Sequence, residues 1–404
     1  MNQLRVTVAR VGACVALACV AVAIAPRHTS AQVIADVERQ LLSERSGTLA
    51  GLDAAFWSAL SRLRKEEDKQ RALKADISFG LTGDEAGDRS LFKLNTGISL
   101  SRGEFPSEVN VVSKLGLQQR DGQLQEDVTS LLISYDYHTT RHIEYFAFAE
   151  RFSDNFLSIQ QRYEIGFGAR AGIHFGNVSG WNDVAESFGT VSAGLAAVRA
   201  AVPGMSIRGQ ALPNLGPDER SGLPLATRRL AHALRDQSSR LFLGIVASVF
   251  SELERAELEV TSRPAAGSTD PVITSRIPVD ATYRYRLTLR PAIRLHPSDE
   301  ITIVVHPYFK LPLDGARRVT VADGSRRLDY RRDVMSEMEW TIKQEQTGLE
   351  SVGFLVTVNH FFDNVPPAVP QKIVADAAAA GRMLNRLEAE RSHRVVALAL
   401  KLKW

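Results

Sequence analysis

From Tyr163 to Phe175, apolar and polar positions alternate without a break. The odd positions are Tyr163, Ile165, Phe167, Ala169, Ala171, Ile173 and Phe175, and the even ones are Glu164, Gly166, Gly168, Arg170, Gly172 and His174. Because successive side chains of a strand point to opposite faces, this pattern predicts a strand with one apolar and one polar face. Thirteen residues at about 3.3 Å each, tilted by about 45°, span roughly 30 Å, the thickness of a bilayer's hydrocarbon core.

The same period-two alternation recurs from residue 91 to the C-terminus. The further segments are 92–101, 109–117, 131–137, 141–152, a weaker glycine- and alanine-rich one at 187–200, 241–249, 283–295, 301–311, 330–342, 352–358 and 396–404. Asp76–Leu81 is a candidate for one more strand. The series predicts an all-β fold, an antiparallel transmembrane β-barrel of about 12 strands, and an even number is usual for such barrels. A secreted soluble β-sandwich is the alternative, in which a core would bury the apolar faces.

The first residues have the parts of a secretory signal peptide: a basic start, an uncharged run from Val11 to Ala25, and small residues before a break at Ala31. We therefore predict that residues 1–31 are removed, with lipidation at Cys14 or Cys19 as a minor alternative. The mature chain would then contain no cysteine, which excludes disulfides and thiolate metal sites. Lys+Arg would fall from 49 by three to 46, against Asp+Glu 46, so the charge gives no argument for nucleic-acid binding.

Three segments depart from the strand pattern. Residues 32–74 predict a periplasmic helical extension, because Leu49, Leu52, Phe56, Leu60 and Leu63 recur at helical spacing. Residues 202–240 and 364–392 predict inserts in the barrel domain, 75–404, the second with an alanine-rich helix over 371–390. With both termini in the periplasm, the count places connections near 119–126, 296–300 and 344–350 on the periplasmic side. It places the connections near 176–186, 262–280, 312–327 and 364–392 outside. The long 202–240 segment is then either a periplasmic insert or evidence that the strand count is wrong at this point.

The chain ends on an alternating strand with a C-terminal aromatic residue, Trp404. Such an ending resembles the assembly signal of bacterial outer-membrane barrels, so the predicted partners are the barrel-assembly machinery and outer-membrane lipid. We predict an outer-membrane location in a Gram-negative bacterium. The sequence does not set the oligomeric state.

Charged side chains on the strands identify the candidate functional surface. A charge at mid-depth on the lipid-facing side costs about 2–4 kcal/mol, so these residues must face a lumen. The lumen-facing candidates are Arg162, Glu164, Arg170, Arg284, Arg286, Arg290 and Arg294. Either they attract anions through a narrow pore, or they pair with inward acids such as Glu164, Glu337 and Glu339 and fill the barrel. Glu164 and Arg170 are the predicted partners of the Arg284–Arg294 row.

The sequence carries no motif for phosphate-binding glycine loops, metal ligands or a nucleophile elbow, so no cofactor and no catalytic residue is predicted. The histidines of the mature chain are scattered singly. His142 and His360 could serve a membrane-embedded hydrolase or lipid-modifying enzyme, but neither has a partner at fixed spacing. A non-enzymatic structural barrel or narrow passive pore is the preferred interpretation, and the hydrolase is the alternative.

Residues 75–176 resemble the salt-induced outer-membrane protein family, a domain of unknown function. The resemblance lies in three segments, Tyr145–Glu150, Arg151–Phe156 and Arg162–Gly168. It implies an outer-membrane β-barrel in Gram-negative bacteria and carries over no site residue. The inserts at 202–240 and 364–392 depart from the compact pattern of that family.

Overall fold

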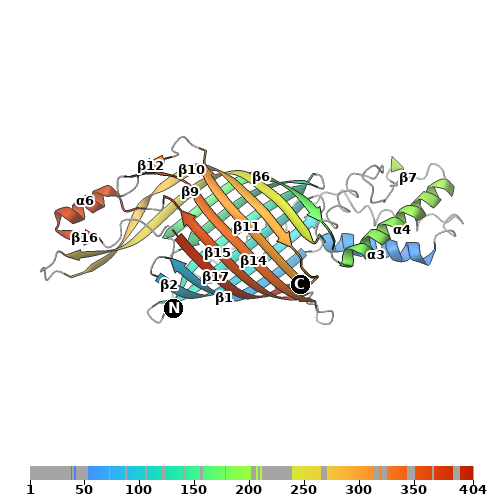
Figure 1. Cartoon of the computed structure of the whole chain (residues 1–404), viewed down its shortest axis with the longest axis horizontal. Helices are drawn as coiled ribbons and strands as arrows, with labels where there is room; N and C mark the ends of the chain where they lie inside the picture. The colour runs from blue at the N-terminus through green and yellow to red at the C-terminus, as the bar shows by residue number, and fades with distance from the viewer. Residues whose placement is uncertain are drawn as a thin grey trace.

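A computed structural model shows the architecture (Figure 1). It describes residues 38, 41, 53–71, 73–86, 89–104, 107–120, 123–139, 142–154, 158–177, 179–201, 206–207, 210–211, 239–264, 271–313, 318–320, 325–343, 351–365, 368–384 and 392–403. The predicted signal peptide, its cleavage site and Trp404 lie outside these residues.

The chain forms one closed antiparallel barrel. Its sheet has 13 strands, of which β16 joins only the end of β9, so twelve make the ring. In ring order they are β1 (Leu73–Ala86), β2 (Arg89–Glu104), β3 (Ser107–Arg120), β4 (Gln123–His138), β5 (Ile143–Asp154), β6 (Ile159–Phe175), β9 (Leu241–Pro264), β10 (Ile273–Leu295), β11 (Ile301–Pro312), β14 (Arg331–Lys343), β15 (Ser351–Asp363) and β17 (Ser392–Lys403). Pairing of β17 with β1, for example Leu402 opposite Ile77, closes the ring. The predicted fold class is confirmed.

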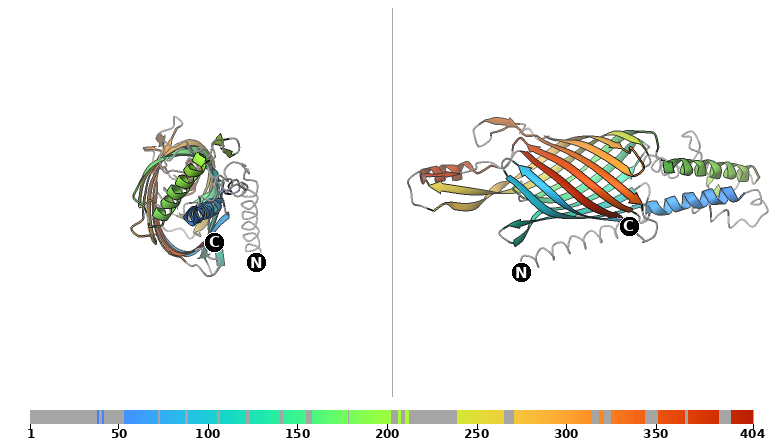
Figure 2. Two further views of the ribbon diagram at one scale, coloured as in Figure 1. Left: turned by 90° about the vertical axis from the view of Figure 1, so that its right-hand side faces the viewer. Right: turned by 60° about the horizontal axis from the view of Figure 1, so that its bottom comes forward.

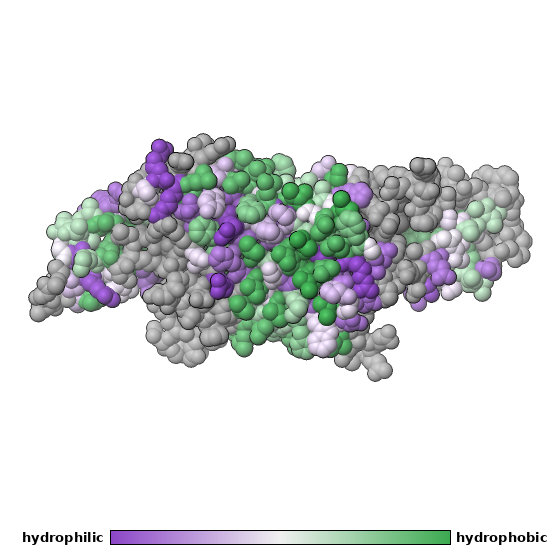
Figure 3. All heavy atoms as spheres, viewed as in Figure 1, coloured by the Kyte–Doolittle hydropathy of each residue, from purple (hydrophilic) through white to green (hydrophobic). Residues whose placement is uncertain are grey.

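Apolar side chains cover the outside of the barrel. On β6 the odd residues point outward, and Ile165 is 64% exposed, with Phe167 and Ile173 beside it on the same face. Similar rows on the other strands form a belt around the middle of the barrel, visible on the face drawn in Figure 3. A continuous apolar surface on a folded chain is normally covered by a partner or by lipid. This belt therefore fits the hydrocarbon core of a membrane. No helix among the described residues has both the length and the hydropathy to cross a membrane.

Two helices project from the end of the barrel where β1 begins and β17 ends, which we call the helix end (Figures 1 and 2). They are α3 (Ala54–Arg71) and α4 (Ser179–Ala201), and they pack on each other. Phe56 and Leu60 of α3 and Leu195 of α4 are buried, and Gly194 leaves room for the Phe56 ring. The described part of the helical face predicted in residues 32–74 therefore packs on a segment for which a strand was predicted, while Leu49 and Leu52 lie outside the described residues.

The strand prediction for 187–200 was wrong. Val191 and Leu195 are four residues apart on one side of α4, the spacing of a helix face, and glycine and alanine between them obscured it. The twelfth strand is β1, of which Asp76–Leu81 is the middle. One false strand and one omitted strand cancelled in the count.

This exchange also corrects the sides of the connections. The connection at 121–122 lies at the end opposite the helix end, which we call the projection end. The connection from 176 to 240 is a single one and lies at the helix end, together with α4 and the short hairpin of β7 (Ser206–Ile207) and β8 (Gln210–Ala211). The strand count was therefore off at this point, and most of the predicted insert, 202–240, lies outside the described residues.

At the projection end, β9 and β10 continue as a ribbon well beyond their neighbours (Figure 1). The ribbon and Val369 form a small core of Leu258, Val260, Ile277 and Val369, against which Ile373 and Val374 of α6 (Gln371–Ala379) pack. The helix predicted over 371–390 is too long. It ends at Ala379, Gly381 turns the chain with φ of 65°, and β16 (Arg382–Leu384) then pairs with β9. The hairpin of β12 (Arg318–Thr320) and β13 (Arg326–Leu328) lies in the connection between β11 and β14.

Candidate functional site in the barrel interior

The charged residues predicted for the lumen all lie on the inner face of the barrel wall. On β10, Tyr283 and Tyr285 are exposed on the outside of the barrel. Arg284 and Arg286, which alternate with them, point inward. Arg290 and Arg294 continue the inner row on β10, and Arg162, Glu164 and Arg170 lie on the inner row of β6.

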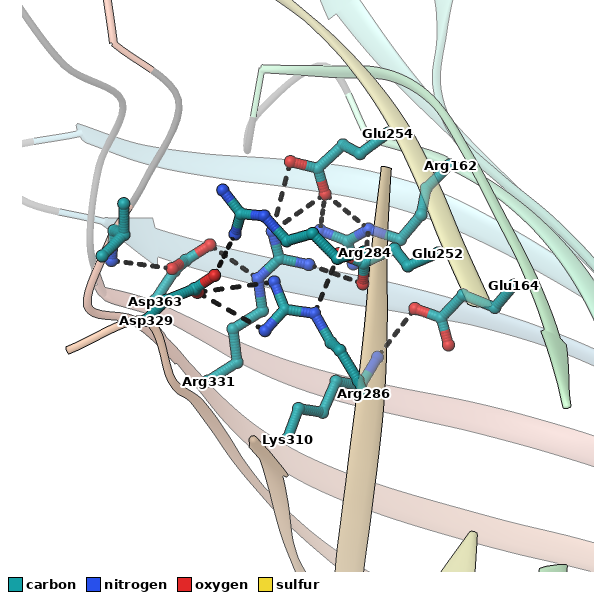
Figure 4. A network of polar contacts seen from close by, with 11 residues as sticks. Arg162, Glu164, Glu252, Glu254, Arg284, Arg286, Lys310, Asp329, Arg331 and Asp363 are labelled. Carbon is teal, nitrogen blue, oxygen red and sulfur yellow. Dashed lines mark hydrogen bonds and ion pairs between the residues drawn. The ribbon is translucent and has the colours of Figure 1, made fainter. Parts of the chain in front are cut away.

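Ten of the inward residues gather at the projection end in what we call the ion-pair network (Figure 4): eight are linked in one set, and Glu164 and Lys310 form a separate pair beside it. Its members are Arg162, Glu164, Glu252, Glu254, Arg284, Arg286, Lys310, Asp329, Arg331 and Asp363. Five are basic and five are acidic, so their formal charges cancel. Arg331 is the first residue of β14 and Asp363 the last of β15, which places the network near the projection end of the lumen.

Glu252 and Arg331 form the centre of the network. Nε of Arg286 donates to Oε1 of Glu252 at 3.0 Å, and a terminal nitrogen of Arg331 donates to its Oε2 at 2.9 Å. Arg331 also reaches Glu254 at 3.0 Å and, through Nε, Asp363 at 2.7 Å. The planar guanidinium with its five N–H donors suits such simultaneous contacts.

Further contacts tie the network across the wall. Nε of Arg162 donates to Glu254 at 2.7 Å, and Nζ of Lys310 donates to Glu164 at 2.8 Å. Arg284 and Arg286 both contact Asp329, at 2.5 and 3.4 Å. These residues come from β6, β9, β10, β11, β14 and β15, six strands in succession around the ring, and from Asp329 just before β14.

The network excludes water from its charges. Arg286 is 0% exposed and Glu252 is 1% exposed. A buried charge that loses its partner costs about 3–5 kcal/mol, so the members depend on one another. The network is therefore a rigid filling along the β6-to-β15 side of this part of the lumen.

The predicted pairing partners were wrong. Glu164 binds Lys310, and Arg170 lies 3.1 Å from Glu144, so neither pairs with the Arg284–Arg294 row. Glu339 lies 3.6 Å from Lys401.

The helix-end half of the lumen is different. Here Arg170, Arg290, Arg294 and His306 form what we call the basic cluster. Arg170 and Arg290 are both opposite Val246, so they lie in one row across β6, β9 and β10. Arg294 lies over the Phe242 ring at 5.6 Å, and Arg290 over Tyr308 at 5.6 Å. Nε of Arg290 and Nδ1 of His306 are buried without a hydrogen-bond partner among the described residues.

Acidic residues line the adjoining arc of β3, β4 and β5, next to β6. Asp136 accepts from the Asn110 amide at 2.7 Å, Glu108 accepts from Ser101 at 2.9 Å, and Glu144 meets Arg170. The helix-end half thus has a basic side and an acidic side, joined by the Arg170–Glu144 pair. Opposed charges of this kind create a field across the lumen.

Sequence reasoning missed six of the ten network members: Glu252, Glu254, Lys310, Asp329, Arg331 and Asp363 were not singled out. For Glu252 and Glu254 a signal was present. They are the next even positions after Val246, Ser248 and Phe250 on the same strand, so alternation places them on the same face. For Lys310 the signal was its inward position on the predicted strand 301–311. Asp329 lies in a connection, where no alternation marks it.

Among the described residues, no group of three or more His, Asp or Glu side chains could hold a metal ion. His142 lies 3.0 Å from the backbone oxygen of Gly172, a structural contact.

No family model and no curated protein matches the chain, so the resemblance to the salt-induced outer-membrane protein family stays a prediction. Among solved structures, the NanC porin is 6% identical over 81% of this chain and 98% of its own, with a TM-score of 0.34. The translocator domain of the autotransporter NalP from Neisseria meningitidis is 8% identical over 86% and 96%, at 0.33. A Pseudomonas aeruginosa FadL homologue is 9% identical over 82% and 89%, at 0.30. The fold class rests on the closed ring of strands described above.

Proposed function

We propose that this chain is a narrow passive pore of the Gram-negative outer membrane, with a preference for small anions. The apolar belt supports the membrane location, because such a surface is stable only against lipid. The basic cluster at the helix end supports the pore, since its charges are not closed into ion pairs as those of the network are. The basic cluster is the single observation that carries the anion preference.

The ion-pair network makes the pore narrow. It occupies the wall of six adjacent strands at the projection end, and its side chains are almost fully buried. In this proposal, ions pass beside the network, along the remaining wall of β1 to β5 and β17. A low conductance follows from this geometry.

The basic cluster gives the preference. Arg290 and His306 have buried nitrogens without a hydrogen-bond partner among the described residues, at Nε and Nδ1 respectively. The positive charges of Arg170, Arg290 and Arg294 attract an anion in the lumen and repel a cation. The acidic arc on β3 to β5 limits the preference to a moderate one.

Planar bilayers with a KCl gradient test this proposal. The wild-type protein should conduct. Its reversal potential should be shifted from zero toward the Nernst potential of chloride. Arg290→Gln should move that potential toward zero, whereas Arg332→Gln, which changes an exposed arginine outside the lumen, should leave it unchanged. A wild-type protein that inserts without conducting would refute the pore and leave a structural barrel.

The route to the membrane is part of the same proposal. A signal peptide cleaved after Ala31 and recognition of the C-terminal strand by the barrel-assembly machinery would deliver the chain. Removal of Trp404 should slow assembly, seen as less heat-modifiable protein in isolated outer membranes. Unchanged assembly of that variant would contradict the role given to Trp404.

A further inference from the structure

A serine and a histidine meet on the outer surface of the barrel, near the projection end. Nε2 of His360 on β15 lies 2.8 Å from Oγ of Ser392 on β17. The two residues are 32 positions apart in the chain, so no sequence motif reveals the pair. His360 is one of the two histidines that the sequence left as hydrolase candidates without a partner.

Register places both side chains on the lipid-facing side. On β15, Phe354 and Val358 are exposed on the outer face. His360 is also at an even position, so it lies on the same face. On β17, Val396 and Leu398 are exposed, and Ser392 shares their parity. The odd positions of β15 point inward, as shown by Asp363, which belongs to the ion-pair network inside the barrel.

The pair lies at the edge of the apolar belt. Val358 opposite Val396 is the last aliphatic pair toward the projection end, and the next pair is His360 opposite Arg394. Beyond it come Arg332 opposite Phe362 and Phe362 opposite Ser392. Arg332 and Arg394 are exposed on this same face. At such an edge the headgroups of lipids replace their acyl chains, and guanidinium groups bind their phosphates.

Other histidine contacts in the barrel lack this access. His174 lies 3.1 Å from the Ser239 hydroxyl, but Ser239 is only 1% exposed. His296 contacts the Thr302 hydroxyl at 3.1 Å in a partly buried position. By contrast, Ser392 is exposed to the surrounding lipid. A nucleophile must be reached by its substrate, so only the His360–Ser392 pair among these three meets that condition.

From this arrangement we infer that Ser392 and His360 hydrolyse an acyl ester of a phosphate-bearing membrane lipid, with Ser392 as nucleophile and His360 as general base. Their separation is within the hydrogen-bond reach that such a pair requires. This activity is independent of the lumen and therefore goes beyond the proposed pore.

The reaction balances with water as the only co-reactant. Oγ of Ser392 attacks the ester carbonyl carbon while its proton moves to Nε2 of His360. The bond to the alcohol oxygen breaks, that oxygen takes the proton from His360, and the acyl group stays on Ser392. Water then gives a proton to His360 as its oxygen attacks the acyl carbon, and the fatty acid leaves as Ser392 regains its proton.

The oxyanion in both steps needs a donor from a side chain. The backbone of β15 pairs with β14 on one side and β17 on the other, so its N–H groups are used within the sheet. The guanidinium of Arg394, opposite His360, is the donor that the geometry offers. Arg332 is then left to bind the lipid phosphate.

The test uses full-length protein purified in detergent, with phosphatidylglycerol carrying fluorogenic acyl chains in mixed micelles. Ser392→Ala should abolish turnover, and His360→Gln should lower it by about 100-fold or more. Ser251→Ala is the matched control, because Ser251 is another outward serine of the wall and contacts only the Ile165 backbone oxygen at 3.4 Å. It should retain wild-type turnover. Heat-modifiable migration verifies that each variant has a folded barrel.

Labelling of the wild-type protein tests the same inference without any variant. A fluorophosphonate should modify Ser392 and leave Ser251 unmodified, as read by mass spectrometry of the peptides. Absence of both turnover and labelling in the folded wild-type protein would overturn the inference, as would equal turnover in Ser392→Ala.

A substitution of Arg332 provides a second test, of phosphate binding. Arg332→Gln should raise KM for phosphatidylglycerol several-fold with kcat nearly unchanged, and it should leave hydrolysis of p-nitrophenyl butyrate, which has no phosphate, unaffected. An equal effect on both substrates would contradict phosphate binding by Arg332.

Discussion

The two halves of the lumen use the same residue types to opposite effect. At the projection end, five basic and five acidic side chains interlock and exclude water. At the helix end, Arg170 meets Glu144, Lys401 lies 3.5 Å from Asp76, and the Arg290 and His306 nitrogens keep unused hydrogen-bonding capacity. A buried charge needs complete pairing, whereas a hydrated one does not. The density of pairing therefore separates a part that fills one side of the barrel from a part that can interact with a passing ion.

Breaking the centre of the network should have the largest effect. Glu252→Ala leaves Arg286 and Arg331 buried with one partner fewer each, and should lower the free energy of unfolding by about 3–5 kcal/mol. Urea unfolding of the refolded barrel in lipid vesicles measures it. Glu186→Ala, an exposed acid on α4, is the control and should change stability by less than about 0.5 kcal/mol. Similar losses in both variants would mean that the network is not a cooperative unit.

The contrast between the outside and inside of β6 should give the next largest effect. Ile165→Arg places a charge in the lipid belt and should cost about 2–4 kcal/mol, enough to impair membrane assembly. Arg170→Ile removes one lumen pair and should be milder, about 1 kcal/mol. Heat-modifiable migration in isolated outer membranes compares them. Equal defects would show that the two faces of β6 have been assigned wrongly.

A smaller effect is expected within the basic cluster. Arg290→Gln removes a charge that has no partner at Nε, so stability should change by less than about 1 kcal/mol while chloride preference falls. Combined unfolding and reversal-potential measurements on one preparation distinguish these outcomes. A large loss of stability with unchanged selectivity would place Arg290 among the structural residues instead.

Salt should give the smallest and most general effect. The Debye length falls from about 10 Å at 0.1 M to about 3 Å at 1 M, so hydrated charges are screened and closed pairs much less so. Anion preference should therefore weaken in 1 M KCl, while the stability difference between wild type and Glu252→Ala should persist. Selectivity that is independent of salt would point to a steric rather than an electrostatic origin.

The sequence predicted the barrel because alternation is a local signal. Tyr163 to Phe175 has the burial pattern that its residue types dictate, and the same holds for Tyr283 to Leu295. The signal failed at 187–200, where small residues blurred the difference between a period of two and the helical period of Val191 and Leu195. Such ambiguity is expected for short segments rich in alanine and glycine.

The pairing inside the lumen could not be predicted in the same way. Lys310 and Glu164 are 146 residues apart and meet only because β6, β9, β10 and β11 are neighbours in fixed register. His360 and Ser392 likewise depend on the register between β15 and β17. Alternation shows which face a residue occupies, but the depth at which it meets another strand depends on the pairing of the whole ring.

Substituted cysteines test the difference between the two halves most directly. The only cysteines of the chain, Cys14 and Cys19, precede the predicted cleavage site, so a single new cysteine would report alone. His306→Cys lies in the basic cluster, whereas Thr288→Cys replaces a side chain that is 1% exposed and bound to Ser248 at 2.5 Å. In refolded protein, a negatively charged thiosulfonate should modify His306→Cys faster than a positively charged one does, and Thr288→Cys should resist both. Equal reaction at the two positions, or faster reaction of His306→Cys with the positive reagent, would contradict a closed network beside an open, anion-attracting half.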